Sequence, residues 1–473
     1  MCHRERPAMF ARVARLRFLC LTAAVLCVAV CHADGTAEAS LLAGAAARSI
    51  VPPFPARMGG FADRKDSFKG VHDEIFARAL VLDNGTAALV LIGSDLTDVD
   101  ADMTKQIREK IQAATGIPPA HVLVSCAHNH SAPSLWEPGR LKQADPKLKE
   151  FFVQQFSDAA IEAFKNRAPA RAGFRAGELK GATRNRQQGN DLIDPQVGVL
   201  RVEARDSRKT IATLFNFTGH PVIIGSNNLL LSGEYPGAAS RAVENLLGGV
   251  AIFTQGAAGD ITVQRSGDPF DEIERIGRTL AGEVVKTAGF VECRDELPLA
   301  GVSKMLSFSP REIPSVEDAQ RALDDAKKQF DAAEKNKGNP DFRRQLEQQV
   351  RLQSVNLRVA KGRKEGTLKL PDAVPAEVQV LQVGDLILVA IPGEIFVEYA
   401  LEMRARARQA VDKHMVLAGY SNGYIGYIIT PRAARTGGYE ASVARVGSEA
   451  GRSLTETAMD LLSTLSEEPQ KTK

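Results

Sequence analysis

Two histidines, His128 and His130, stand one residue apart behind a short apolar run that begins at Val122, and Pro133 follows them. The β-branched run predicts a buried strand that the proline cannot continue. Strand ends hold the reacting groups of many α/β proteins, and side chains two residues apart in an extended chain point the same way. Both imidazoles are therefore expected to face one cavity, where they could bind zinc or transfer protons. Two surface histidines in a loop are the alternative.

Further residues of ligand type follow other expected elements. His220 comes directly after a strand expected over residues 210–218, and Glu394 stands at the expected start of a helix that runs to about Val411. Residues 255–262 form a glycine-rich turn after another apolar run, but they lack the Gly-Lys-Ser/Thr ending of a phosphate-binding loop. We therefore exclude a nucleotide site of that kind.

The elements that must position these groups alternate between short apolar strands and amphipathic helices. This alternation predicts a mixed α/β (α+β) fold, a single large domain in which helices flank mixed sheets. Asn84-Gly85 between two apolar runs predicts a tight β-hairpin. Further strands are expected near residues 170–176, 196–203, 250–253, 376–383 and 386–391, and helices near 98–115, 147–167 and 235–247.

Residues 315–364 differ in composition from the rest of the chain. Apolar residues recur at spacings of four and three between charged ones, in two runs separated by residues 336–340. The pattern predicts an antiparallel helical hairpin inserted between two strands. We interpret it as a solvated spacer, with a lid or a docking arm as the alternative.

Residues 1–33 are expected to be a secretory signal peptide. Arginines precede an apolar run from Phe18 to Val30, and small residues surround a cut expected after Ala33. Lipoprotein anchoring through Cys31 is the alternative, but Val30 is bulky where a small residue is expected. Because the run is too short to span a membrane comfortably, the chain is expected to be secreted or periplasmic.

Composition narrows the classes of function further. The net charge is +3, and residues 1–33 carry five Arg and one Glu, so their removal would leave −1 and no reason to expect a nucleic-acid partner. Beyond residue 33 only Cys126 and Cys293 remain, too few for a disulfide scaffold. Cys126 is expected to be a core residue. No later stretch has 18 apolar residues in a row, so no transmembrane segment is expected in the mature chain.

Six motifs in a fixed order carry a resemblance to a known family. They are Ala-His-Asn-His-Ser-Ala-Pro at 127–133, Thr-Arg-Asn-Arg at 183–186, Phe-Thr-Gly-His-Pro at 217–221, Ala-Gly-Asp-Ile-Thr at 258–262, Ile-Pro-Gly-Glu at 391–394, and the tyrosine-rich segment 419–440. In these motifs the chain resembles the N-terminal catalytic domain of the neutral/alkaline, non-lysosomal ceramidases. The resemblance implies a ceramidase-like zinc hydrolase domain over residues 40–473, without the immunoglobulin-like domain that follows it in true ceramidases.

What the resemblance implies is a zinc-dependent amidohydrolase that cleaves the N-acyl amide bond of ceramide or a related lipid. The family's ligands for one Zn²⁺ per chain correspond to His128, His220, Glu394 and Tyr427. Two imidazoles and a carboxylate are a known hydrolytic zinc set that leaves a position open for water. The family's catalytic positions correspond to His130, Arg186, Thr262 and Tyr439. In that reading His130 moves protons or holds the oxyanion, and Arg186 and Tyr439 donate to developing charge.

Two departures from the family pattern bear on the substrate. Thr262 replaces the family's serine, which keeps the hydroxyl but adds a methyl group, and Gln187-Gln188 follow Arg186 where the family has Ser-Pro. The expected partner is therefore a lipid or another N-acyl amide, met at a membrane surface. A zinc hydrolase of a different amide or ester, or a non-catalytic, zinc-stabilised binding protein of the cell envelope, are the alternatives.

Overall fold

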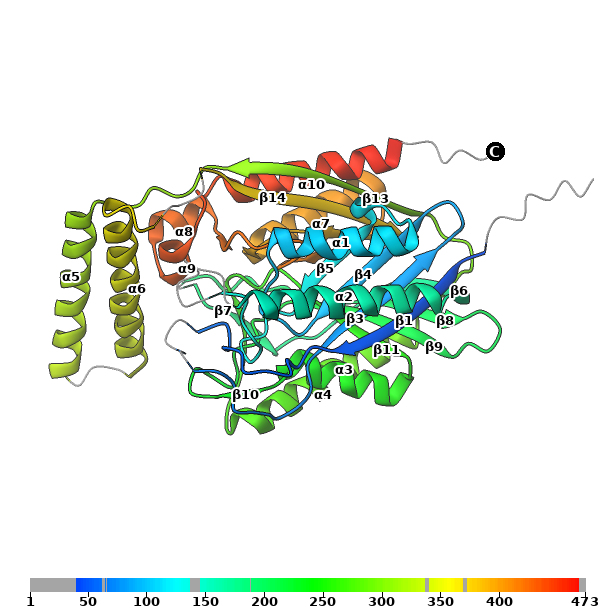
Figure 1. The fold of residues 1–473 in the computed structure, drawn as a ribbon, viewed down its shortest axis with the longest axis horizontal. Helices are drawn as coiled ribbons and strands as arrows, with labels where there is room; N and C mark the ends of the chain where they lie inside the picture. Colours follow the sequence, from blue (N-terminus) through cyan, green and yellow to red (C-terminus); the bar gives the residue numbers. More distant parts are fainter. Residues whose placement is uncertain are drawn as a thin grey trace, which may run out of the picture. The chain divides into compact units, whose positions relative to one another are not determined.

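Eight strands form the largest sheet of the computed structural model, in the order β11-β9-β8-β6-β1-β3-β4-β5 (Figure 1). The pairs β4–β5 and β9–β11 are parallel and the pairs between them antiparallel, so the sheet is mixed, as predicted. The expected Asn-Gly hairpin joins β3 to β4. In chain order the strands are β1 (Leu42–Ser49), β3 (Phe76–Asp83), β4 (Ala88–Ser94), β5 (Val122–Cys126), β6 (Ala168–Glu178), β8 (Gln196–Ala204), β9 (Thr210–Phe217) and β11 (Val250–Gln255).

Side chains alternate along these strands and give the sheet two apolar faces. One face packs against four helices through two clusters of buried residues. These helices are α1 (Ala101–Thr115), α2 (Pro146–Lys165), α3 (Glu234–Leu247) and α4 (Pro269–Ala288). A short 3₁₀ turn, η1 (Pro119–His121), leads from α1 into β5. The other face, rich in leucine, packs against a second sheet.

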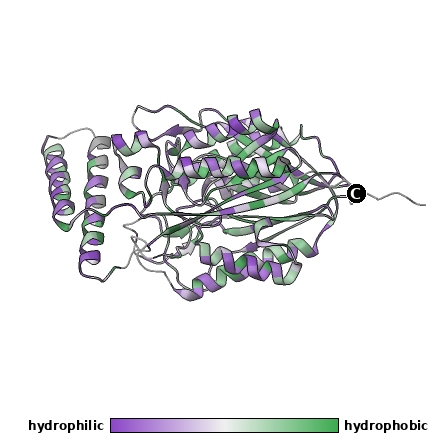
Figure 2. Cartoon of the chain, turned by 90° about the horizontal axis from the view of Figure 1, so that it is seen from above, coloured by the Kyte–Doolittle hydropathy of each residue, from purple (hydrophilic) through white to green (hydrophobic). Residues whose placement is uncertain are grey.

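The second sheet has four strands in the order β13-β14-β15-β17. They are β13 (Leu299–Phe308), β14 (Val374–Val383), β15 (Leu386–Ala390) and β17 (His414–Ala418). Its outer face is covered by α7 (Val397–Val411) and α10 (Ala450–Glu467). The chain therefore stacks helices, sheet, sheet and helices, and Figure 2 shows the hydrophobic residues concentrated in the strands between the helices. The predicted mixed fold with flanking helices is confirmed.

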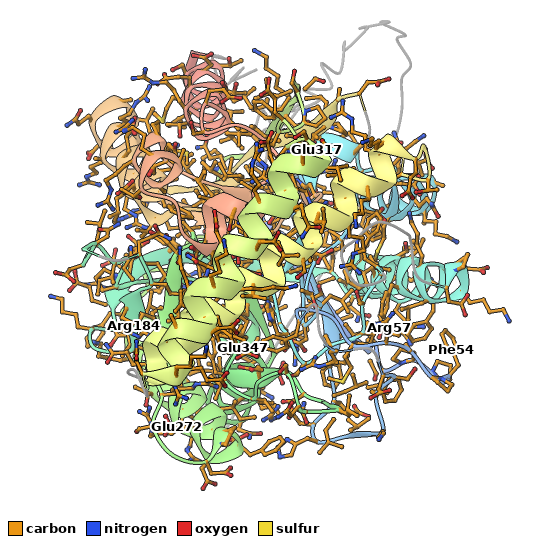
Figure 3. All side chains as sticks on the ribbon, turned by 90° about the vertical axis from the view of Figure 1, so that its left-hand side faces the viewer. Phe54, Arg57, Arg184, Glu272, Glu317 and Glu347 are labelled. Atoms are coloured by element: carbon orange, nitrogen blue, oxygen red, sulfur yellow. The ribbon has the colours of Figure 1, made fainter. Side chains whose placement is uncertain are left out.

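The predicted helical hairpin is confirmed as α5 (Val316–Lys335) and α6 (Pro340–Lys364). It is inserted between β13 and β14, which stay paired up to Phe308 and Val374. The two helices hold a small apolar cluster of their own that includes Leu323 and Leu357. Figure 3 looks onto the hairpin, with Glu317 in the first turn of α5 and Glu347 in α6.

Three pairs of very short strands and two short helices complete the described part of the chain. The pairs are β2 (Gly70–Val71) with β10 (Leu230–Leu231), β7 (Thr183–Asn185) with β12 (Ile261–Val263), and β16 (Glu394–Ile395) with β18 (Tyr427–Ile428). The helices are α8 (Pro431–Thr436) and α9 (Tyr439–Val443). Most of the residues singled out by the sequence lie in or beside these pieces.

The structure describes residues 40–61, 64, 66–136, 145–187, 189–336, 340–368 and 372–467. The expected signal peptide, residues 1–33, lies outside this range. Within the described part, no helix is both long and apolar enough to span a bilayer. Cys126 and Cys293 are buried and are not bonded to each other, and Cys126 belongs to the core as expected.

Candidate metal centre

His128 lies in the loop beyond β5, where the chain is no longer extended. Its φ is 61°, in the left-handed region that residues other than glycine rarely adopt. Strand alternation is therefore not the reason why the two imidazoles face one cavity. The two rings are nevertheless close, with their Nε2 atoms 3.2 Å apart in His128 and His130. The Nδ1 atom of His128 lies 2.9 Å from the Thr97 carbonyl oxygen, and the ring of Tyr420 stacks on the imidazole at 4.1 Å.

His220 and Glu394 approach His128 from two other segments. His220 follows β9, and its Nδ1 lies 2.8 Å from the carbonyl oxygen of Ala258. The sequence predicts that Glu394 begins a helix, and this prediction is wrong. The backbone of Glu394 pairs with β18, and α7 begins only at Val397. The Oε2 atom of Glu394 is 3.3 Å from Nε2 of His128 and 3.4 Å from Nε2 of His220.

These facing atoms are all hydrogen-bond acceptors when both rings are neutral. A carbonyl oxygen can only accept, so each Nδ1 bound to one carries the proton and each Nε2 presents its lone pair. Burial lowers the pKa of His220 well below its ordinary value. Burial opposes the ionisation of Glu394, yet the pKa of this carboxyl is lowered, and the hydroxyl of Tyr424 donates to it.

This arrangement fits a metal ion. Among the described residues, the buried Oε2 of Glu394 has no hydrogen-bond donor, although two imidazole nitrogens face it. The histidines His128, His130 and His220 offer ligand atoms that all lie within 4.8 Å of one another. Crowded lone pairs in a buried site repel each other unless a cation lies between them. Imidazole nitrogen together with carboxylate oxygen is a donor set typical of zinc.

His130 is enclosed by the segment that precedes β2. The ring of Phe61 meets its imidazole edge-on at 4.9 Å, and Gly60, at φ 86°, leaves the space beside it. A Cβ atom at residue 60 would lie only 2.2 Å from Cγ of His130. Arg64 donates to the carbonyl oxygens of His130 at 2.6 Å and of Gly225 at 2.8 Å, so it ties two loops together around this residue. Burial lowers the pKa of His130 well below its ordinary value.

Arg186 follows β7 and reaches the same region. Its backbone N–H donates to the carbonyl oxygen of Asp260 at 2.7 Å, and its guanidinium pairs with Glu440 at 3.0 Å. Burial alone would lower the pKa of Arg186, but Tyr427 and Glu440 raise it above its ordinary value. A partly buried cation thus stands beside the phenol of Tyr427 and the start of α9.

Tyr427 and Tyr439 both lie near Arg186. Tyr427 is paired with Glu394 across β16 and β18, and paired residues on neighbouring strands project from the same face. Burial and Glu394 raise the pKa of Tyr427 well above its ordinary value, and Arg186 opposes that rise. The rings of Tyr427 and Tyr439 are 6.0 Å apart. Desolvation and Glu394 raise the pKa of Tyr439 to about 12, so its hydroxyl keeps its proton at neutral pH although 45% of the residue is exposed.

Thr262 lies in β12 and forms an isolated bridge with His220. Two residues earlier, Asp260 accepts from the side chain of Asn185 at 2.8 Å and from the backbone N–H of Val397 at 2.9 Å. Burial raises the pKa of Asp260 to about 6. This carboxyl therefore connects the strand before Arg186 to the first turn of α7. All eight residues selected from the sequence thus lie in one region.

Two further tyrosines of the segment 419–440, for which no role is expected from the sequence, contact the cluster. The hydroxyl of Tyr424 donates to Oε1 of Glu394 and so fixes the carboxylate whose other oxygen faces the histidines. Tyr420 stacks on His128 and has a φ of 52°. The density of tyrosines in this segment is visible in the sequence, but their spacing does not indicate which of them contact the cluster.

Comparison with known proteins gives a consistent result. Residues 44–270 match the family described as neutral/alkaline non-lysosomal ceramidase, N-terminal. Curated relatives include a neutral ceramidase of Mycobacterium tuberculosis, 22% identical over 450 residues, and one of Pseudomonas aeruginosa, 24% identical over 439 residues. Each alignment covers 79% of this chain, and the chain spans 69% and 64% of these relatives.

The fold is also similar to solved structures. The crystal structure of the neutral ceramidase from Pseudomonas aeruginosa matches with a TM-score of 0.73 at 20% identity, over 91% of this chain and 75% of that one. A structure described as ceramidase complexed with C2 matches with a TM-score of 0.72 at 18% identity, over 91% of this chain and 76% of the other. At these identities the structural similarity establishes the fold.

Proposed function

Because residues 44–270 match the neutral/alkaline non-lysosomal ceramidase family, we propose that this chain is a secreted, zinc-dependent amidohydrolase that cleaves the N-acyl amide bond of ceramide or a related lipid. The observation that carries the proposal is the convergence of His128, His220 and Glu394 with their acceptor atoms facing one another. Arg186 and Tyr439 both lie beside this cluster. Their presence supports hydrolysis over a purely structural metal site, which would need neither residue.

In this proposal one Zn²⁺ is held by His128, His220, Glu394 and Tyr427. Glu394 is favoured as the third ligand because its Oε2 faces the Nε2 atoms of both His128 and His220, whereas Nε2 of His130 contacts His128. Tyr427, paired with Glu394 and adjacent to the cation of Arg186, supplies the fourth ligand. When bound, zinc supplies Lewis acidity that brings the pKa of a water molecule near neutrality.

The chain's own groups have separate tasks in the reaction. His130, a neutral imidazole beside His128, accepts the proton of the attacking water and returns it to the leaving amine. Arg186 and Tyr439 donate hydrogen bonds to the amide oxygen as it gains negative charge. Tyr424 and the two backbone carbonyls that hold the Nδ1 atoms orient the ligand set.

The proposed function is tested by measuring fatty-acid release from a short-acyl and a long-acyl ceramide, beside a water-soluble acyl amide. We expect release from ceramide that stops on treatment with a chelator and returns with Zn²⁺. Turnover of the soluble amide alone would favour a hydrolase of another substrate. A zinc-containing protein with no activity on any of the three would favour the envelope binding protein.

Thr262→Ala is expected to lower turnover about tenfold and to leave it measurable. Thr262 lies beside His220 and shapes the pocket, but an activated water makes a covalent acyl intermediate unnecessary. Steady-state kinetics and intact-protein mass spectrometry during turnover check this expectation. An acyl group trapped on Thr262 in the unmodified protein would contradict it.

Gly60→Ala is expected to reduce turnover about a hundredfold while zinc remains bound. The added Cβ would lie 2.2 Å from Cγ of His130 and must displace that ring, and a displacement of about 1 Å in a catalytic group can cost this much. Gly116→Ala is the matched control, because Gly116 has a φ of 76° with no atom within 4 Å of the added Cβ. This control measures how much turnover is lost when alanine replaces a glycine with positive φ and no neighbouring side chain is displaced. Equal losses in the two variants would argue against a role for His130.

A further inference from the structure

The inserted hairpin is joined to the body of the chain through Arg311, which lies between β13 and α5. The neighbouring Pro310 forms an isolated bridge with Val446, and the backbone N–H of Arg311 donates to the carbonyl oxygen of Arg445 at 2.7 Å. Helix α6 also contacts α9. The views of Figures 1 and 3 show the hairpin standing at the end of the described domain where α8 and α9 lie. The root of the hairpin thus touches the segment that runs from Tyr439 to Val446.

The side chain of Arg311 holds the end of α9. Its Nη1 donates to the carbonyl oxygens of Ala441 at 3.1 Å and Ser442 at 2.8 Å. Helix α9 has five residues, so its last carbonyls have few partners within the helix, and a guanidinium is the favoured group at a helix C-terminus. The Nη2 atom reaches Oδ1 of Asn356 in α6 at 3.4 Å, which links the same guanidinium to the hairpin.

The segment held in this way carries three residues that contact the surroundings of the candidate metal centre: Tyr439, Glu440 and Arg445. At its start, Tyr439 lies against Tyr427, and Glu440 pairs with Arg186 at 3.0 Å. Near its end, the guanidinium of Arg445 lies over the ring of Tyr424 at 5.7 Å, and Tyr424 donates to Glu394. A shift of this segment would therefore move an expected oxyanion donor and loosen the support of an expected metal ligand.

We propose that Arg311 is a positioning residue that fixes residues 439–446 against the active site, so that the inserted hairpin acts as a brace for one wall of the site. This assignment rests on the proposed function for its catalytic consequence, but the bracing itself does not. It replaces the interpretation of the hairpin as a mere spacer, because the guanidinium that holds the end of α9 also reaches Asn356 in α6, and α6 itself contacts α9.

The proposal is tested with Arg311→Ala in the full-length protein. Hydrogen exchange measured by mass spectrometry is expected to speed up in peptides covering residues 439–446, because the carbonyl oxygens of Ala441 and Ser442 lose their side-chain donor. Turnover of a short-acyl ceramide in detergent micelles is expected to fall about tenfold with little change in KM and in zinc content. Arg311→Lys, which keeps the charge at the helix end but not the fork, is expected to restore part of both effects.

Arg321→Ala is the matched control. The substitution is of the same type, but Arg321 lies in α5, ten residues after Arg311, and pairs with Asp318 on the surface. It should leave both exchange and turnover unchanged. Unchanged exchange at residues 439–446 in Arg311→Ala, or an equal effect of Arg321→Ala, would overturn the proposal. If the unmodified protein releases no fatty acid from ceramide, the proposed function fails, while the exchange measurement still decides the role of Arg311.

Discussion

Replacing His220 by alanine is expected to abolish zinc binding and, with it, all measurable hydrolysis. His220 contributes a neutral, fully buried imidazole whose Nδ1 is held by the carbonyl oxygen of Ala258, which leaves only Nε2 for a metal. Without this nitrogen the remaining set loses one imidazole, and the carboxylate of Glu394 loses a neighbour at 3.4 Å. No other histidine of the described chain lies close enough to substitute except His130, which is already needed for proton transfer.

The measurement is zinc content by mass spectrometry alongside turnover, on protein purified without added metal. His414→Ala is the control, because His414 is exposed at the start of β17 and its ring lies against Phe174. That variant should keep one zinc per chain and full activity. Full zinc occupancy in the His220→Ala protein would contradict the assignment of His220 as a ligand. Zinc loss with retained activity would contradict zinc-dependent hydrolysis.

Tyr439→Phe is expected to reduce the turnover number by about a hundredfold to a thousandfold, the usual cost of losing one oxyanion donor. The change removes only a hydroxyl, which keeps its proton at neutral pH because desolvation and Glu394 raise the pKa of Tyr439 to about 12. The ring remains in place against Tyr427. We therefore expect normal zinc content and a near-normal KM with a collapsed turnover number.

Zinc and steady-state kinetics should be measured on the same preparation. Tyr399→Phe serves as the control, since the hydroxyl of Tyr399 donates to the carbonyl oxygen of Ile429 at 3.2 Å in the core cluster beneath α7, and faces a backbone group instead of the histidines. It should cost stability, roughly 1 kcal/mol for the lost hydrogen bond, and leave turnover alone. Loss of zinc in Tyr439→Phe, or a change limited to KM, would show that Tyr439 has another role.

The sequence was sufficient to predict the mixed fold and most element positions, because strands and helices here have clear apolar periodicity. The hairpin is the clearest case: the change in spacing around residues 336–340 coincides with the end of α5 at Lys335 and the start of α6 at Pro340. Local pattern is enough for such elements because their apolar residues pack against each other within the hairpin.

The candidate site was harder to derive from local pattern. His128 and His130 were expected to share a cavity because of strand alternation, and they share it instead because His128 turns into left-handed backbone, which no local signal predicts. Glu394 was expected at a helix start, but its pairing with residue 427, far away in the sequence, keeps it in a strand. Tyr424 was overlooked for the same reason, since its partner Glu394 lies 30 residues away.

The paired ends of β13 and β14 also matter for engineering. Phe308 and Val374 are direct neighbours across the two strands, so the chain leaves the sheet and returns to it at nearly the same point. The entropy of closing a loop there grows only slowly with its length, and the register of the strands does not depend on what the loop contains. The far end of the hairpin, between Lys335 and Pro340, is therefore a permissive insertion point, where a reporter domain or an affinity handle could be grafted without disturbing the sheet or the contacts of Arg311.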